Sequence, residues 1–246
     1  PNGETAPIFS SVHPRTVERH MKWVRDYNID GVFQQRFLSD IEGKHGRSVC
    51  DQVVRNTKGG CDKFGRVFAI MYDGSGRSNI AEDVKRDWMH LVDNVGIFGD
   101  SYLHHNGKPL VALWGFTRRK TTTPEALSEL IDWFHTGAPE KYRASVKLGV
   151  FDRFYKNTDY AEALKKADVL SPWYVGRYLD KAEYEAFLHN KIVPAQKWCD
   201  AQDILFVPVL YPGFSWWNLR NGGDPKNREP RDGGKFYWMQ SYGAIH

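Results

Sequence analysis

Aromatic rings and short polar side chains follow most of the apolar runs in this chain. The set comprises Gln35, Arg36, Tyr72, Asp73, Trp114, Asp152, Trp173 and Tyr174, followed by Tyr211, Ser215, Trp216 and Asn218. Flat aromatic faces pack against the CH faces of a sugar, while amides, hydroxyls and carboxylates bond its hydroxyl groups. The pattern therefore predicts a carbohydrate-binding surface.

The segment 207–218, VPVLYPGFSWWN, is the richest of these places. It begins like a buried strand and ends in aromatic rings, a hydroxyl and an amide. An apolar strand needs no such ending for packing alone. The segment contains no carboxylate, so we expect it to form a wall of a sugar site and not its catalytic centre.

Two carboxylates directly follow predicted strands, Asp73 and Asp152. Hydrolysis of a glycosidic bond generally needs two carboxyl groups, one to protonate the leaving oxygen and one to act as nucleophile or base. Both residues are therefore catalytic candidates. Each also has a structural explanation, since Asp73 can cap the Gly-rich turn after it and Asp152 can pair with Arg153. Arg36 can likewise orient a substrate oxygen or form a structural ion pair.

The elements that must position these residues alternate between apolar runs and segments of helical periodicity. Asn79 and Glu82 have capping-box spacing ahead of one helix, Thr123-Pro124 opens another, and Pro194 is expected to kink or split a long helical region. The His104-His105 pair falls in a predicted solvated loop. Six strands are predicted, at 32–37, 67–72, 110–114, 146–151, 169–173 and 204–210.

Strand–helix alternation with continuous apolar strands predicts an α/β fold with a parallel sheet covered by helices. A doubly wound open sheet and a (β/α)8 TIM-type barrel both fit. No Gly-rich phosphate loop follows any strand, which disfavours the first, and polar residues recur at strand ends, as at the rim of a barrel. We therefore expect a single (β/α)8 barrel domain over residues 1–246. Only six strand–helix units are visible, so we expect the printed sequence to contain an incomplete barrel.

The composition excludes several functional classes. With 246 residues, 41% hydrophobic and 26% charged, the chain can bury a sizeable core. The net charge of +4 is mild and the basic residues are dispersed, apart from 118–120, so no nucleic-acid partner is predicted. No apolar run is long enough to span a bilayer. Three widely spaced cysteines and adjacent histidines predict no disulfide framework, no metal site and no cofactor.

One series of segments runs in order along the chain: HPRTVERH at 13–20, IDGV at 29–32, GRVFAIMYD at 65–73, HNGKP at 105–109, SPW at 171–173, VGR at 175–177 and PGFSW at 212–216. These segments resemble those of bacterial proteins related to glycoside hydrolase families 71 and 99. The resemblance implies a (β/α)8 barrel acting on glycans in an extracellular or periplasmic location. Family 99 members are endo-acting α-mannosidases and α-mannanases that retain anomeric configuration, and family 71 members are α-1,3-glucanases.

The resemblance also implies that the acid pair of these relatives lies on a last strand, after a helix that begins at Phe236. That strand would follow His246, so the pair is not carried onto any residue here. The main hypothesis is a retaining, endo-type glycoside hydrolase acting on an α-linked polysaccharide or glycan. The alternative is a non-catalytic carbohydrate-binding barrel. A metal-dependent hydrolase would need His and carboxylate clusters at strand ends, which the sequence lacks.

Overall fold

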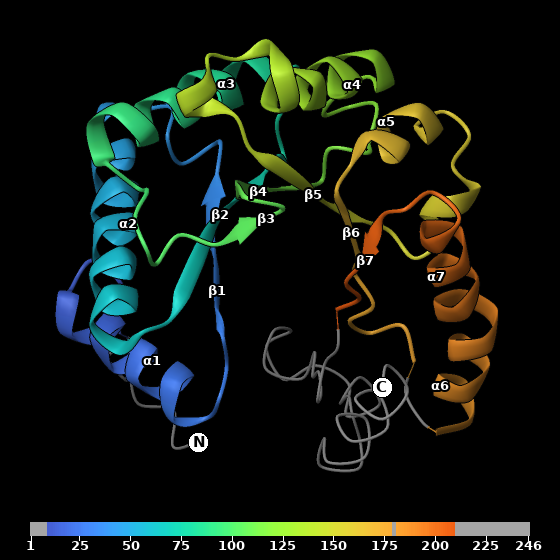
Figure 1. Cartoon of the computed structure of the whole chain (residues 1–246), viewed down its shortest axis with the longest axis horizontal. Coiled ribbons are helices and arrows are strands. Elements are labelled where there is room, and N and C mark those ends of the chain that lie inside the picture. The colour runs from blue at the N-terminus through green and yellow to red at the C-terminus, as the bar shows by residue number, and fades with distance from the viewer. Residues whose placement is uncertain (1–8, 179–180, 210–246) are drawn as a thin grey trace, which may run out of the picture. The chain divides into compact units, whose positions relative to one another are not determined.

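The computed structural model describes residues 9–178 and 181–209, and Figure 1 shows their helices and strands. The chain divides into two compact units, Pro1–Lys147 and Leu148–His246. Each of the six predicted strands has a counterpart, and helices separate them as expected. The predicted α/β class is therefore confirmed. The expectation of one domain over residues 1–246 stays a prediction.

The sheet of the first unit is built from parallel strands that follow chain order. Strand β1 (Gly31–Phe37) pairs with β2 (Val67–Asp73), and β2 pairs with β4 (Lys108–Trp114). Strand β5 (Ser145–Val150) is buried along its whole length. In the register, Phe37 lies beside Asp73 and Asp73 beside Trp114, so these strands end at one edge.

A short strand, β3 (His104–His105), runs antiparallel to β4 and pairs with Pro109 and Lys108. The loop predicted at His104-His105 is therefore wrong, although His104 is exposed to solvent as expected. The intervening Asn106 and Gly107 both have positive φ, at 50° and 75°. An Asn-Gly pair with these angles is the usual turn of a tight β-hairpin, because its twist matches that of the flanking strands.

Helices α1 (Pro14–Asp26) and α2 (Lys44–Phe64) pack against each other, and α2 also contacts β1 and β2. A Cβ atom at Gly60 of α2 would lie 2.8 Å from Met21 Cγ of α1, so only glycine permits this close approach.

Helix α3 (Ala81–His90) continues into a π-helical turn, Leu91–Val95, and contacts α4 (Pro124–Asp132), which continues into another, Trp133–Gly137. A 3₁₀ turn, Glu140–Tyr142, precedes β5.

The two predicted helix starts of this unit have different outcomes. Thr123 caps α4 by accepting a hydrogen bond from the Ala126 N–H at 3.2 Å, as predicted. The capping box at Asn79 is wrong, because α3 begins after Ile80 and has no side-chain cap. Asn79 instead has a left-handed backbone with φ of 54°, a conformation that Asn adopts more easily than most residues. Asn79 therefore serves the turn before α3 and does not cap the helix.

The second unit contains α5 (Ala161–Lys166), β6 (Val169–Pro172), α6 (Lys181–Phe187), α7 (Val193–Asp200) and β7 (Leu205–Phe206), after a 3₁₀ turn at Phe154–Lys156. Strands β6 and β7 are parallel. A π-helical turn, Leu188–Ile192, separates α6 from α7, and Pro194 lies in the first turn of α7, so the predicted split is confirmed. The predicted strand 204–210 is shorter in the described residues.

Alternate residues of β1 point to opposite faces of the sheet, as in any strand. Gln34 and Arg36 face α2, since Thr57 of that helix donates a hydrogen bond to Gln34 Oε1 at 2.8 Å and Arg36 reaches Asp51. Phe33 and Gln35 therefore lie on the face away from α2. The same alternation on β2 sends Tyr72 and Asp73 to opposite faces.

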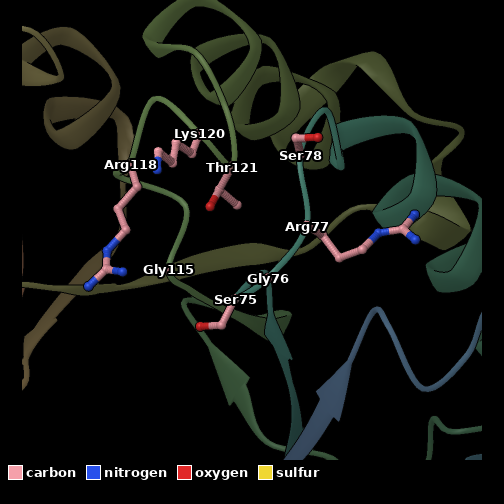
Figure 2. Close-up of a pocket in the computed structure, with 8 residues that line it drawn as sticks. All are labelled: Ser75, Gly76, Arg77, Ser78, Gly115, Arg118, Lys120 and Thr121. Atoms are coloured by element: carbon pink, nitrogen blue, oxygen red, sulfur yellow. The ribbon is translucent and has the colours of Figure 1, made fainter.

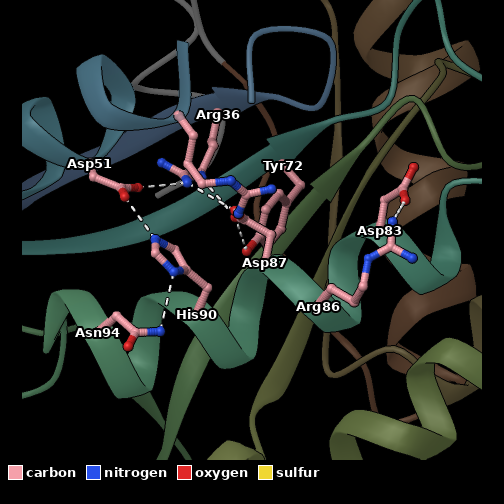
Figure 3. Close-up of polar contacts among 9 residues, drawn as sticks. Arg36, Asp51, Tyr72, Asp83, Arg86, Asp87, His90 and Asn94 are labelled. Atoms are coloured by element: carbon pink, nitrogen blue, oxygen red, sulfur yellow. Dashed lines mark hydrogen bonds and ion pairs between the residues drawn. The ribbon is translucent and has the colours of Figure 1, made fainter. Parts of the chain in front are cut away.

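A buried polar network joins β1, β2, α2 and α3 on the helix-covered face (Figure 3). Arg36 donates from Nε and Nη2 to the two carboxylate oxygens of Asp87, at 2.7 and 2.9 Å, and from Nη2 to Asp51 at 2.8 Å. The Tyr72 hydroxyl donates to Asp87 at 2.9 Å, and His90 Nε2 lies 2.7 Å from Asp51 Oδ2. This network fixes how α2 and α3 sit on the strands.

Burial and ion pairing act in opposite directions on Arg36. Its side chain is 1% exposed, which disfavours the charged form, but the hydrogen bonds that it donates to Asp87 raise the pKa of Arg36 above its ordinary value. Burial, together with the adjacent Asp87 charge, raises the pKa of the Tyr72 hydroxyl. Arg36 therefore stays a cation and Tyr72 a neutral donor at all physiological pH values.

We predict that Asp87→Asn lowers the free energy of unfolding by about 3–5 kcal/mol, because it leaves a buried guanidinium with one carboxylate fewer. Urea denaturation followed by circular dichroism measures this change. The control is Glu162→Gln, which removes an exposed ion pair with Lys165 and should leave stability nearly unchanged. Equal small effects from both substitutions would contradict the role given to the network.

Candidate functional site

The face away from the helices carries polar and aromatic side chains at the carboxyl ends of β1, β2 and β4. Gln35 Nε2 donates a hydrogen bond to Asp73 Oδ2 at 2.8 Å, and Trp114 is the neighbour of Asp73 in the register. Phe33 and Phe37 present rings that are 39% and 36% exposed. Amide, carboxylate and aromatic groups thus share one face of the sheet, with Asp73 itself only 4% exposed.

Asp73 also performs the turn-capping role that is its structural explanation. Its Oδ1 accepts the Ser75 N–H at 2.8 Å, and the next residue, Gly74, donates its N–H to the Trp114 carbonyl at 3.0 Å. Each carboxylate oxygen therefore already has one donor from the protein. Each keeps further acceptor capacity, since an ionised carboxylate offers about four lone-pair sites. Asp73 is thus a fixed acceptor, 4% exposed, with lone pairs that these two donors do not fill.

Lys147 is a functional candidate that the sequence prediction missed. It lies in the middle of the buried strand β5, with its side chain 7% exposed and its Nζ 4.6 Å from the centre of the Phe33 ring. Burial lowers the pKa of Lys147 to about 8. A lysine inside the run SVKLGV is the signal that could have identified it, since an apolar strand rarely contains an ammonium group.

In the second unit, Trp173 and Asp152 are accessible and Tyr174 is not. The Trp173 side chain is exposed, with 44% of the residue accessible, and its backbone N–H donates a hydrogen bond to the Val150 carbonyl at 3.0 Å. Asp152 is partly buried, and its Oδ1 lies 4.0 Å from Arg177 Nη2, which differs from the predicted pair with Arg153. Tyr174 is 1% exposed and packs its ring on Phe187, so its predicted sugar contact is corrected to a core position.

Arg36 and Tyr72 require the same correction. Both side chains are buried on the helix-covered face, where Asp87 binds them, so their predicted substrate contacts give way to structural ones. In two places the prediction assigned two consecutive strand residues to the site, although period-two alternation in a strand lets only one of them face a ligand. The two pairs are Gln35–Arg36 on β1 and Tyr72–Asp73 on β2. Trp173 and Tyr174 follow β6, which ends at Pro172, and packing against Phe187 places Tyr174 in the core.

The remaining predicted residues, Tyr211, Ser215, Trp216 and Asn218, lie outside the described residues. Within residues 9–178 and 181–209, no group of three His, Cys, Asp or Glu side chains could hold a metal ion. A search of the same ranges finds no helix with the length and apolarity to cross a membrane.

Solved structures of carbohydrate-active enzymes share the fold of this chain. Two structures of a GH99 endo-α-mannosidase from Bacteroides thetaiotaomicron, one of them in complex with bis-tris propane, match 96% of the chain with a TM-score of 0.68 and 19% sequence identity. A glycoside hydrolase-like protein matches 93% with a TM-score of 0.68 and 10% identity. The chain spans 67%, 64% and 71% of these structures respectively. No protein-family model matches the chain.

Lys147 should make stability depend on pH in a defined window. The lysine pKa is 10.5 when unperturbed and about 8 in the folded chain, so between these values the unfolded chain binds more protons. Stability therefore rises with pH from about 8 to about 10.5. We predict that Lys147→Met is more stable than wild type at pH 7, by up to about 3 kcal/mol, and that this advantage disappears near pH 10.5.

Urea denaturation at pH 7, 8, 9 and 10 tests the Lys147 prediction. Lys156→Met, which removes an exposed lysine, should differ from wild type by the same small amount at every pH. A stability difference for Lys147→Met that does not change with pH would contradict the buried, destabilised ammonium.

Proposed function

We propose that the chain is part of a glycoside hydrolase that acts on an α-linked polysaccharide or glycan, with retaining, endo-type chemistry. The observation that carries the proposal is the fold similarity to GH99 endo-α-mannosidase structures, which extends over 96% of the chain. The Gln35–Asp73–Trp114 surface supports it, because it lies at the carboxyl ends of parallel strands, where enzymes of (β/α)8 type bind substrate.

Each residue of this surface has a proposed task. Asp73, held by Gln35 and the Ser75 N–H, accepts a hydrogen bond from a sugar hydroxyl. Trp114 stacks on a CH face of a sugar ring, and the exposed Trp173 does the same in the second unit. Lys147 contributes a positive group on the side of Phe33, where it can meet hydroxyl oxygen or developing negative charge.

A retaining mechanism needs two carboxyl groups about 5–5.5 Å apart, one as nucleophile and one as acid and then base. Within the described residues, Asp73 of the first unit and Asp152 of the second each stay a candidate for one such group, and no pairing of the two is proposed. Asp73 fits a binding role better than an acid role, because both of its oxygens accept hydrogen bonds from the protein. This observation favours the second candidate function, a carbohydrate-binding barrel without turnover. An extracellular or periplasmic location is part of the main proposal, and fractionation of the source cells tests it.

The main proposal predicts that the intact protein releases oligosaccharides from an α-mannan or an α-1,3-glucan. Product analysis by chromatography, with ¹H NMR of the first anomeric product, measures both cleavage and retention. Binding to the same glycans without release of any product would favour the carbohydrate-binding barrel. Absence of both binding and cleavage, with folded protein, would contradict both candidates.

Asp73→Asn should lower kcat/KM on a cleaved glycan by at least about tenfold, because a charge-assisted hydrogen bond to a sugar hydroxyl is lost. Asp100→Asn is the control, since Asp100 is an exposed carboxylate in the loop before β3. Steady-state kinetics and thermal denaturation should be measured together. An unchanged kcat/KM with a lower melting temperature would restrict Asp73 to its turn-capping role.

A further inference from the structure

A cleft of about 460 Å³ lies between the loop after β2 and the loop after β4 (Figure 2). Its lining includes the hydroxyls of Ser75, Ser78 and Thr121 and the cationic side chains of Arg77, Arg118 and Lys120. None of the described residues that line the cleft is a carboxylate. Its lining thus combines positive charge with neutral hydroxyl groups.

The three cations of the cleft have different surroundings. Arg77 forms ion pairs with Glu42 and Asp83, and in Figure 2 its guanidinium points away from Arg118 and Lys120. Glu42 and Asp83 are therefore engaged by Arg77. Lys120 is exposed and has no ion pair with the part of the chain that the structure describes. Its ammonium thus gives the opposite side of the cleft a positive charge.

The cleft adjoins the strand ends that carry Asp73 and Trp114. Ser75, which lines the cleft, donates its backbone N–H to the Asp73 carboxylate, and Gly74 donates its N–H to the Trp114 carbonyl. Gly76 and Gly115 line the cleft with φ of 80° and 83°, so both loops have left-handed turns directly after these strands. A glycan bound at these strand ends would therefore lie beside the cleft.

We propose that this cleft binds an anionic substituent of the glycan, a carboxylate or a sulfate ester, with Lys120 and Arg118 as the cationic partners and Ser75, Ser78 and Thr121 as hydroxyl donors. The identification of the ligand as a glycan rests on the proposed function, whereas the anion site is inferred from the lining of the cleft. It specifies the substrate class as an acidic α-glycan, and charge-assisted hydrogen bonds supply the recognition.

The test uses the full chain labelled with ¹⁵N and three small probes at low ionic strength. The probes are methyl α-D-glucuronide, its neutral match methyl α-D-glucoside, and inorganic sulfate. We expect the glucuronide to shift the amide signals of residues 75–78 and 118–121 and to bind at least about twentyfold more tightly than the glucoside. The preference should weaken at 0.5 M NaCl, because salt screens exposed charges.

Three variants connect this preference to the cleft. Lys120→Gln should lower glucuronide affinity about fivefold and R118Q/K120Q about twentyfold, with glucoside affinity unchanged. Arg119→Gln removes an equal charge from the same loop, but Arg119 does not line the cleft, so affinity should stay within about twofold of wild type. Circular dichroism checks that each variant is folded.

The outcomes separate the two proposals. Equal affinity for glucuronide and glucoside, or an equal loss in Arg119→Gln and Lys120→Gln, overturns the anion site and leaves glycan hydrolysis intact. Binding of sulfate alone, without glucuronide, shows a free-anion site and overturns the glycan-borne assignment. Selective glucuronide binding without cleavage of any α-glycan, neutral or acidic, supports the anion site and contradicts the hydrolase.

Discussion

The ion pairs between Arg36 and the carboxylates of Asp51 and Asp87 are the constraint on which the first unit depends. A guanidinium that is 1% exposed is tolerated only because both carboxylates bind it in good geometry. These bonds hold α2 and α3 against β1 and β2. By fixing the face on which Arg36 lies, they also fix the opposite face, where Gln35 and Asp73 meet.

The site follows from this division of the sheet into two faces. On the helix-covered face, the hydroxyl of Tyr72 is satisfied by a buried partner, Asp87. On the other face, Asp73 is oriented by Gln35 and by the turn after β2, yet it keeps acceptor capacity. Turn capping and ligand binding are therefore compatible for Asp73, because the turn positions the carboxylate at the strand end.

Several features could be predicted because they depend on local sequence patterns. Apolar runs gave the strand positions and the α/β class, Thr123-Pro124 gave the start of α4, and Pro194 gave the division between α6 and α7. The site could be predicted only in part. Tyr72 and Tyr174 look the same in sequence as ligand-binding aromatics, and only the register and packing show that they are core. Lys147 could have been found from its place in an apolar strand, but its contact with Phe33, more than a hundred residues away in sequence, is a tertiary feature.

The central claim is that the face bearing Gln35, Asp73 and Trp114 contacts the glycan, while the face bearing Arg36 and Tyr72 is structural. A crystal structure of the protein with an α-linked mannotetraose tests it most directly. The account predicts a sugar ring against Trp114 with a hydroxyl within hydrogen-bonding distance of Asp73. A sugar bound elsewhere, with Asp73 and Trp114 free of contact in an otherwise well-ordered structure, would contradict it.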